Sequence, residues 1–264
     1  MKTSCLQLPV TMFALMLMWS WNVALGMQQP DRIAQLLAQG NDFSEKQFDN
    51  QKALDSYLQA DALAPRNAEI LWRISRAYVD IGEHLPTATD EEKEKQLDTY
   101  QKSLNYADSA VAADPKNSMA YCRRAIATGR VALFKGVFSV GGLVNSTRSD
   151  CEKAIQLDPN NAAAYYVLAR AHAALVEKPK LFRWPLGLGW GNIDDAIKNY
   201  EKATALRPDF IMYHLDAARA YVENDDYAKA KEQLNIIPKL TKEDEDDDQF
   251  RKQATELLEE IKDK

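Results

Sequence analysis

The sequence has 264 residues, with 33 lysines and arginines against 39 aspartates and glutamates and a formal net charge of −6. Negative charge on the chain argues against nucleic acid or anionic lipid as its main partner, because both are themselves negative. Only ten glycines and ten prolines are present, and so few helix-breaking residues favour an all-α fold.

The first 26 residues have the features of a secretory signal peptide. Lys2 supplies one positive charge, and a mostly apolar run extends from Val10 to Trp21 before small residues precede Met27. The run is shorter than the roughly 20 residues that a membrane-spanning helix needs. We expect cleavage near Gly26 and export of a soluble chain to the periplasm or the extracellular space. A retained N-terminal membrane anchor is the alternative.

Four short phrases recur along the chain: ALAPRNA, AADPKNS, QLDPNNA and ALRPDFI. Their prolines lie at positions 65, 115, 159 and 208, in steps of 50, 44 and 49 residues, which indicates a constant unit with variable insertions. Small or aromatic residues lie 12, 8 and 5 residues before each proline. This spacing puts them on one helix face, where small side chains let a second helix approach closely. Proline ends that helix and starts the next one.

The pattern predicts five helix pairs, at residues 31–64, 68–114, 118–158, 162–207 and 211–237. The chain then divides into a signal peptide (1–26), a helical-repeat domain (27–238) and an acidic linker with a C-terminal capping helix (239–264). Six consecutive acids, Glu243 to Asp248, precede the amphipathic segment of this last part. Acids near a helix start complement its dipole, and a solenoid needs a terminal helix to cover its last apolar surface.

The small-xxx-aromatic-xx-Ala-xxxx-Pro spacing resembles the second helix of tetratricopeptide (TPR) repeats, and AARAYVENDDYAKAKEQL (217–234) resembles a nearly unmodified repeat. Three further segments resemble the regulator of microtubule dynamics family and its bacterial relatives over residues 68–263. They are LWRISRAY from Leu71, the charged insertion that begins DEEKEKQL, and the apolar insertion before NIDDAIKNYEKA. The resemblance implies a TPR-like α-solenoid of about five antiparallel helix pairs with long insertions inside the repeats.

Arginine recurs eleven residues after three of the four prolines, and aromatic side chains lie four residues before two of these arginines. The residues concerned are Trp72, Arg76, Tyr166, Arg170 and Arg219. In TPR proteins this helix face lines a concave groove, so the resemblance implies a groove for a protein or peptide. The arginines would then bind carboxylates of acidic segments. Alternatively, each arginine pairs with an acid of its own or a neighbouring repeat, such as Asp80, Asp114, Asp158 or Glu223.

Two apolar connectors, VALFKGVFSVGGLVN (131–145) and KPKLFRWPLGLGWGN (178–192), join the helices of the third and fourth pairs. They should leave the same edge of the solenoid as neighbours. Their candidate surface residues are Phe138, Phe182, Trp184 and Trp190. The connectors either pack on each other as a local core, form a partner surface, or contact a membrane interface. Membrane contact is the least favoured, since glycine and proline interrupt any regular amphipathic helix there.

Cys122 and Cys151 remain once the signal peptide is removed. The TPR hairpin places them at about the same height, so the resemblance implies either a disulfide or two buried free thiols. We expect His172 to be a packing residue, because it takes the position that tyrosine holds in other units. No catalytic or nucleotide-binding motif is present, and we expect no catalytic residue, metal or cofactor.

Together these features predict an exported, non-enzymatic scaffold or adaptor that binds a protein or peptide through the groove, the insertion surface or both. A structural or self-assembling subunit of an envelope complex is the first alternative. A microtubule-associated regulator, as the family resemblance implies, is the second. The sequence leaves the oligomeric state open.

Overall fold

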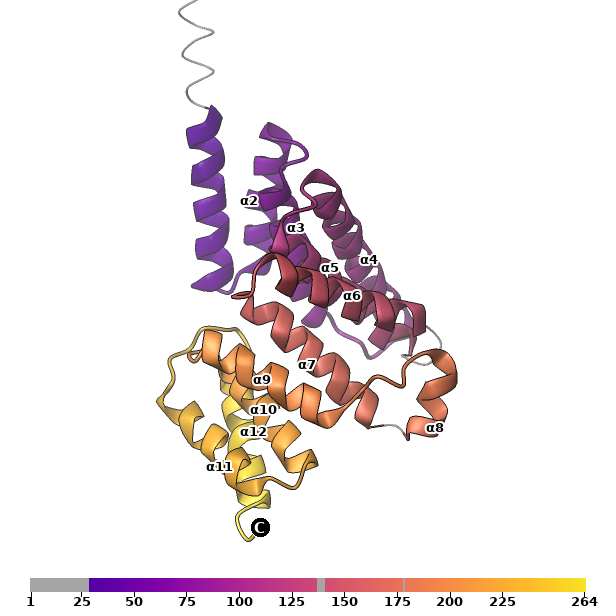
Figure 1. Ribbon diagram of the computed structural model, residues 1–264. Coiled ribbons are helices and arrows are strands. Elements are labelled where there is room, and N and C mark those ends of the chain that lie inside the picture. The colour runs from indigo at the N-terminus through magenta and orange to yellow at the C-terminus, as the bar shows by residue number, and fades with distance from the viewer. Residues whose placement is uncertain (1–28, 137–140, 178) are drawn as a thin grey trace, which may run out of the picture.

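Antiparallel helix pairs follow one another along the chain in a computed structural model that describes residues 29–136, 141–177 and 179–264 (Figure 1). The first helices of the pairs are residues 29–45, α3 (Ala68–Glu83), α5 (Ser118–Lys135), α7 (Ala162–Val176) and α10 (Ile211–Glu223). The second helices are α2 (Asn50–Leu63), α4 (Asp90–Ala113), α6 (Gly141–Leu157), α9 (Ile193–Leu206) and α11 (Tyr227–Ile236). The described residues contain no strand, and the predicted solenoid of five helix pairs is confirmed.

Three of the four proline phrases carry an asparagine two residues after the proline, and this asparagine caps the next helix. The side-chain oxygen of Asn67 accepts hydrogen bonds from backbone N–H groups in the first turn of α3, and Asn117 and Asn161 do the same for α5 and α7. Such caps satisfy N–H groups that have no partner within the helix. The fourth phrase has Phe210 at this position, so α10 begins without a side-chain cap.

The small and aromatic residues that precede each proline form the contacts within the pairs. The residues at positions 12, 8 and 5 before each of the four prolines are all buried, with exposed fractions of 0 to 5 %. Glycine allows the closest approach of all. A Cβ added to Gly82 of α3 would lie 2.5 Å from Cε1 of Tyr100 on α4. The helices of a pair are therefore held by short-range packing of small against large side chains.

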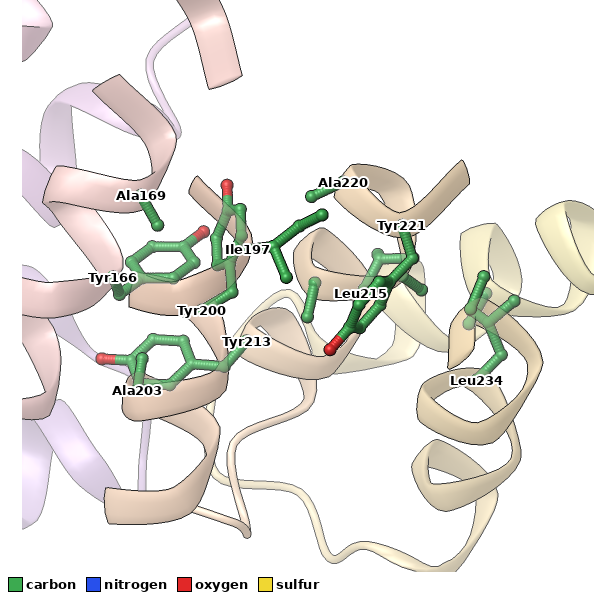
Figure 2. Packing of buried hydrophobic residues seen from close by; sticks show 14 of the residues in the cluster. Tyr166, Ala169, Ile197, Tyr200, Ala203, Tyr213, Leu215, Ala220, Tyr221 and Leu234 are labelled. Atoms are coloured by element: carbon green, nitrogen blue, oxygen red, sulfur yellow. The ribbon is translucent and has the colours of Figure 1, made fainter. Parts of the chain in front are cut away.

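One apolar cluster joins the last two pairs to the terminal helix α12 (Asp247–Glu260) (Figure 2). Tyr166 of α7 stacks on Tyr213 of α10 with ring centroids 4.4 Å apart, and Tyr200 of α9 lies 5.9 Å from Tyr166 in a tilted arrangement. Figure 2 shows the three rings meeting between their helices. Ala254 and Ile261 extend the cluster, so α12 covers the apolar surface of the last pair, as a solenoid end requires.

The second apolar connector lies against the end of the first that the structure describes, Gly141 to Asn145, as expected. The second one forms α8 (Lys180–Arg183) and the short 3-10 helix η2 (Trp184–Leu186), at the edge of the molecule in Figure 1. A Cβ added to Gly141, at the start of α6, would lie 3.1 Å from the carbonyl oxygen of Leu186. Trp190 Nε1 donates a hydrogen bond of 2.8 Å to Asn145 Oδ1. The third and fourth pairs are therefore joined through their insertions as well as through their helices.

Two predictions fall on parts of the chain outside the described residues. These are the signal peptide, residues 1–26, and the candidate surface residue Phe138. Within the described ranges, none of the helices combines the length and the apolar character needed to cross a membrane.

Candidate peptide-binding face

The three predicted arginines lie on first helices of the solenoid: Arg76 on α3, Arg170 on α7 and Arg219 on α10. Each pairs with an acid of its own or the neighbouring helix pair. Arg76 contacts Glu45 at 2.9 Å and Asp80 at 3.4 Å. Arg219 contacts Asp216 at 2.8 Å, and Arg170 reaches the same carboxylate at 3.8 Å. The arginines thus join successive repeats, which is the second of the two arrangements that the sequence allowed.

Asp216 is the acid shared by the last two repeats, and the sequence pattern missed it. Its Oδ2 accepts a hydrogen bond of 2.7 Å from the Tyr166 hydroxyl, 50 residues earlier in the chain. Burial raises the pKa of Tyr166, and the neighbouring Asp216 carboxylate raises it further. Arg170 and Arg219 balance this one carboxylate while their own side chains remain 41 % and 48 % exposed. These two guanidinium groups therefore keep surface from which a ligand can be contacted.

The two aromatic residues expected to line the groove are buried. Tyr166 belongs to the cluster of Figure 2. Trp72 is 8 % exposed, and its Nε1 donates to Glu69 at 2.9 Å. The Arg73 guanidinium lies 4.1 Å from the Trp72 ring centroid. Trp72 and Tyr166 therefore pack beneath the arginines and offer little surface for contact with a ligand.

Arg123 on α5 is the residue of this region that the sequence analysis overlooked. Its guanidinium lies 5.8 Å from the Trp72 ring centroid, and its Nε is buried without a hydrogen-bond partner. No ion pair reaches it from the parts of the chain that the structure describes, in contrast to Arg76, Arg170 and Arg219. Burial lowers the pKa of Arg123, and the charge of Arg76 lowers it further.

We call Arg76, Arg123, Arg170 and Arg219 the arginine face. Arg123 lies eight residues after Pro115 and the other three lie eleven residues after their prolines. Positions three apart share a helix face, so the spacings of eight and eleven residues after the prolines together predict all four. The positive charges of the arginine face are therefore unequally compensated. Three of the arginines have acidic partners, and Arg123 has none among the described residues.

Another ion pair, beside the arginine face, joins α3 to α5. Glu83 near the end of α3 pairs with Arg130 of α5. Burial raises the pKa of Glu83, while the charges of Arg130 and Arg170 act in the opposite direction. Glu83 therefore links α3, α5 and α7 electrostatically.

The apolar connectors divide into a buried and an exposed part. Leu188 is fully buried with Ala132, Val144 and Leu175, and Trp190 packs on this cluster. His172 meets the Trp190 ring edge to face at 4.8 Å, which confirms it as a packing residue. The local core that the sequence suggested thus exists and contains Trp190.

Phe182 and Trp184 lie on the other side of the same connector and are exposed. Their exposed fractions are 67 % and 72 %. Of the four predicted surface residues, then, two are exposed, one is packed, and Phe138 lies outside the described residues.

Cys122 of α5 and Cys151 of α6 are both buried and both free. Burial raises the pKa of the Cys122 thiol to about 11 and that of Cys151 well above its usual value. The disulfide that the sequence left open is therefore absent here, and the alternative of two buried thiols holds. Deep burial among small side chains is a common setting for cysteines that act as small apolar residues.

Residues 36–262 match the sequence pattern of a family described as regulator of microtubule dynamics protein 1-3. The chain belongs to this family. Regulator of microtubule dynamics protein 3 of Rattus norvegicus is 29 % identical over 201 residues, which cover 72 % of this chain and 40 % of the rat protein. Protein 1 of Bos taurus is 25 % identical over 207 residues, covering 75 % of this chain and 63 % of the bovine protein. The chain thus spans less than two thirds of the length of these relatives.

The fold also agrees with a solved structure. A thermophilic TPR protein of Thermus thermophilus superposes with a TM-score of 0.63 at 17 % identity, covering 86 % of this chain and 98 % of that protein. At this identity the likeness concerns the fold alone. The predicted family and its TPR architecture are both confirmed, and the family match extends upstream of residue 68 into the first helix pair.

Proposed function

We propose that this chain is an exported, non-enzymatic scaffold that binds an acidic segment of a protein or peptide at the arginine face. The single observation that carries the proposal is Arg123. Its guanidinium is partly buried, its Nε has no hydrogen-bond partner, and no acid among the described residues pairs with it. A charged donor in such a place is costly unless a ligand supplies the acceptor.

A carboxylate is the natural acceptor for this group. The guanidinium presents parallel N–H donors that match the two oxygens of a carboxylate, and such charge-assisted pairs are stronger than neutral hydrogen bonds. The half-exposed Arg170 and Arg219 continue the row toward the last repeat. An extended peptide with several acids would contact more than one repeat, which is how solenoids hold extended ligands.

Fluorescence anisotropy of labelled acidic peptides tests the proposal. The comparison peptides carry asparagine and glutamine in place of aspartate and glutamate. We expect saturable binding of the acidic set only, weakened about tenfold or more in Arg123→Gln and partly kept in Arg123→Lys. Arg148→Gln is the matched control, because Arg148 lies over the Trp190 ring at the connectors. Equal binding of acidic and neutral peptides, or equal affinity of Arg123→Gln and the wild type, would overturn the proposal.

Export rests on the features of residues 1–26 and has its own test. Intact mass measurement of the protein recovered from its source should give a chain that begins at or near Met27. A recovered chain that retains Met1 to Gly26 would contradict export by cleavage.

A microtubule-associated role is the second candidate, and family membership favours it. The relatives are named for the regulation of microtubule dynamics, and the matched region includes most of this chain. Co-sedimentation with assembled microtubules distinguishes the candidates. Microtubule binding that persists in Arg123→Gln would place this activity on a surface other than the arginine face. If the chain does not bind microtubules at all, the microtubule-associated role is excluded.

A further inference from the structure

Large apolar side chains are exposed at the tip of the second connector. We call them the insertion patch: Leu181 and Phe182 on α8 with Trp184 and Leu186 on η2. Leu181 is 77 % exposed, and Figure 1 shows α8 at the margin of the molecule, away from the stacked pairs. Leu133, near the end of α5, is 51 % exposed as well. Exposed apolar groups gathered in this way mark an interaction surface on a soluble domain.

Buried contacts beneath the patch hold these side chains outward. Arg183 is buried, and its Nη1 donates to the Gly191 carbonyl at 2.7 Å. Leu188 and Trp190 anchor the following residues in the local core. A Cβ added to Gly189 would lie 2.8 Å from Cδ1 of Trp184, so the indole rests on the glycine backbone. The connector therefore has a packed base and an apolar tip.

The charge around the patch is opposite in sign to that of the whole chain. No aspartate or glutamate occurs from Lys178 to Ile193 in the second connector, or from Pro115 to Ser149 around the first. Lys180 lines a shallow pocket together with Trp184 and Trp190, whereas Arg148, 4.9 Å from the Trp190 ring centroid, is already paired with Glu152 at 2.7 Å. Lys180 therefore places a positive charge beside the exposed Trp184 of an acidic protein.

We infer that the insertion patch docks the protein on an anionic lipid bilayer as a peripheral contact. Tryptophan prefers the depth of the lipid headgroups, phenylalanine and leucine insert as apolar side chains, and lysine beside them interacts with negative lipids. The patch is small for a protein partner. With aromatic side chains burying on the order of 150–250 Å² each, it offers roughly 500 Å², below the about 800 Å² per partner of a stable protein interface. A bilayer needs only a few inserted side chains.

Vesicle co-sedimentation with the chain from Met27 onward tests the inference. One set of vesicles contains phosphatidylcholine alone, and the other adds phosphatidylglycerol. We expect binding to the anionic set, weakened by salt, and a loss of about tenfold or more in the Phe182→Ala, Trp184→Ala double variant. Lys180→Glu should weaken binding to anionic vesicles only. Because these residues are exposed, the variants should keep the helix content and melting temperature of the wild type.

Controls separate this surface from the others. Trp72→Phe and Trp190→Phe leave Trp184 as the only tryptophan after Met27, and its emission should shift to the blue on anionic vesicles. Arg123→Gln should sediment like the wild type, so failure of peptide binding and failure of membrane binding are distinguishable. Lack of binding to anionic vesicles at low salt would overturn the inference. A dimer in solution that Trp184→Ala dissociates would also overturn it, since the patch would then be a contact between two copies.

Discussion

The side-chain amide of Asn50, at the start of α2, donates a hydrogen bond of 2.9 Å to the carboxylate of Glu245, 195 residues later. A second contact joins the same regions, since His84 Nε2 lies 3.4 Å from Asp246 Oδ1 just after the end of α3. The acidic residues before α12 therefore reach back to the first two helix pairs. Contacts of this kind make the two ends of the solenoid dependent on each other, whereas stacked repeats otherwise contact only their neighbours.

Glu245→Ala should lower the free energy of unfolding by about 1 kcal/mol, the usual net value of one hydrogen bond in a protein. Glu256→Ala is the control, because Glu256 makes only an exposed ion pair with Lys252 at 3.9 Å. Such pairs contribute about 0.3–0.5 kcal/mol. Urea unfolding of both variants checks the difference. Equal effects would mean that the contact between the two ends adds no stability.

His84 should make stability depend on pH. Burial lowers its pKa, but the hydrogen bond to the Asp80 carbonyl and the charges of Glu245 and Asp246 outweigh burial and raise it above 6.5. A raised pKa in the folded state gives stability that is fully present below 6.5 and is lost as pH rises through the folded pKa.

Chemical unfolding at a pH below 6.5 and at a pH above the folded pKa of His84 should show the loss of stability in the wild type. His84→Gln should not show it. The comparison is needed because His172 has a lowered pKa through burial and acts in the opposite sense. A pH profile of His84→Gln that parallels the wild type would exclude His84 as the source.

Gly82→Ala and Gly142→Ala should change stability in opposite directions. A methyl group on Gly82 would press on the buried Tyr100 ring at 2.5 Å, whereas one on Gly142 of α6 meets nothing within 4 Å. Overpacking of this kind costs about 1–3 kcal/mol, and alanine in an open helix position adds about 0.5–1 kcal/mol. Thermal unfolding measures both. A stabilised Gly82→Ala would show that α3 and α4 are less closely packed than described.

Cys122 and Cys151 should resist thiol reagents in the native protein. Burial removes access and raises the pKa of Cys122 to about 11, so little thiolate exists at neutral pH. We expect slow reaction of these two thiols under native conditions and rapid reaction of both once the chain is unfolded. An intact mass two hydrogens lower than the reduced chain would instead indicate a disulfide.

The repeat architecture was predictable because proline, asparagine and small residues act locally. Pro115 and Asn117 end one helix and cap the next within three residues, and Ala107, eight residues before Pro115, is fully buried. The partners of the arginines were not predictable in the same way. Asp216 meets Tyr166 across 50 residues, and only the folding of two repeats against each other brings them together.

The connectors show the same limit. Trp184 and Trp190 occur in one glycine-rich segment, yet Trp190 finds Asn145 and the local core while Trp184 remains exposed. The difference arises from how the two connectors pack on each other, and a single-sequence pattern carries no signal for it. Arg123 departs from the repeat for a simpler reason, since it lies three residues nearer to its proline than Arg76, Arg170 and Arg219 do to theirs.

The most direct measurement of the central claim is the nuclear magnetic resonance signal of the Arg123 Nε–H group during titration with an acidic peptide. Its assignment comes from its loss in Arg123→Lys. Because Arg123 Nε is buried without a partner, binding of a carboxylate should shift this signal along one saturable curve that matches the affinity from anisotropy. A signal that stays unchanged while the peptide binds would contradict recognition at the arginine face.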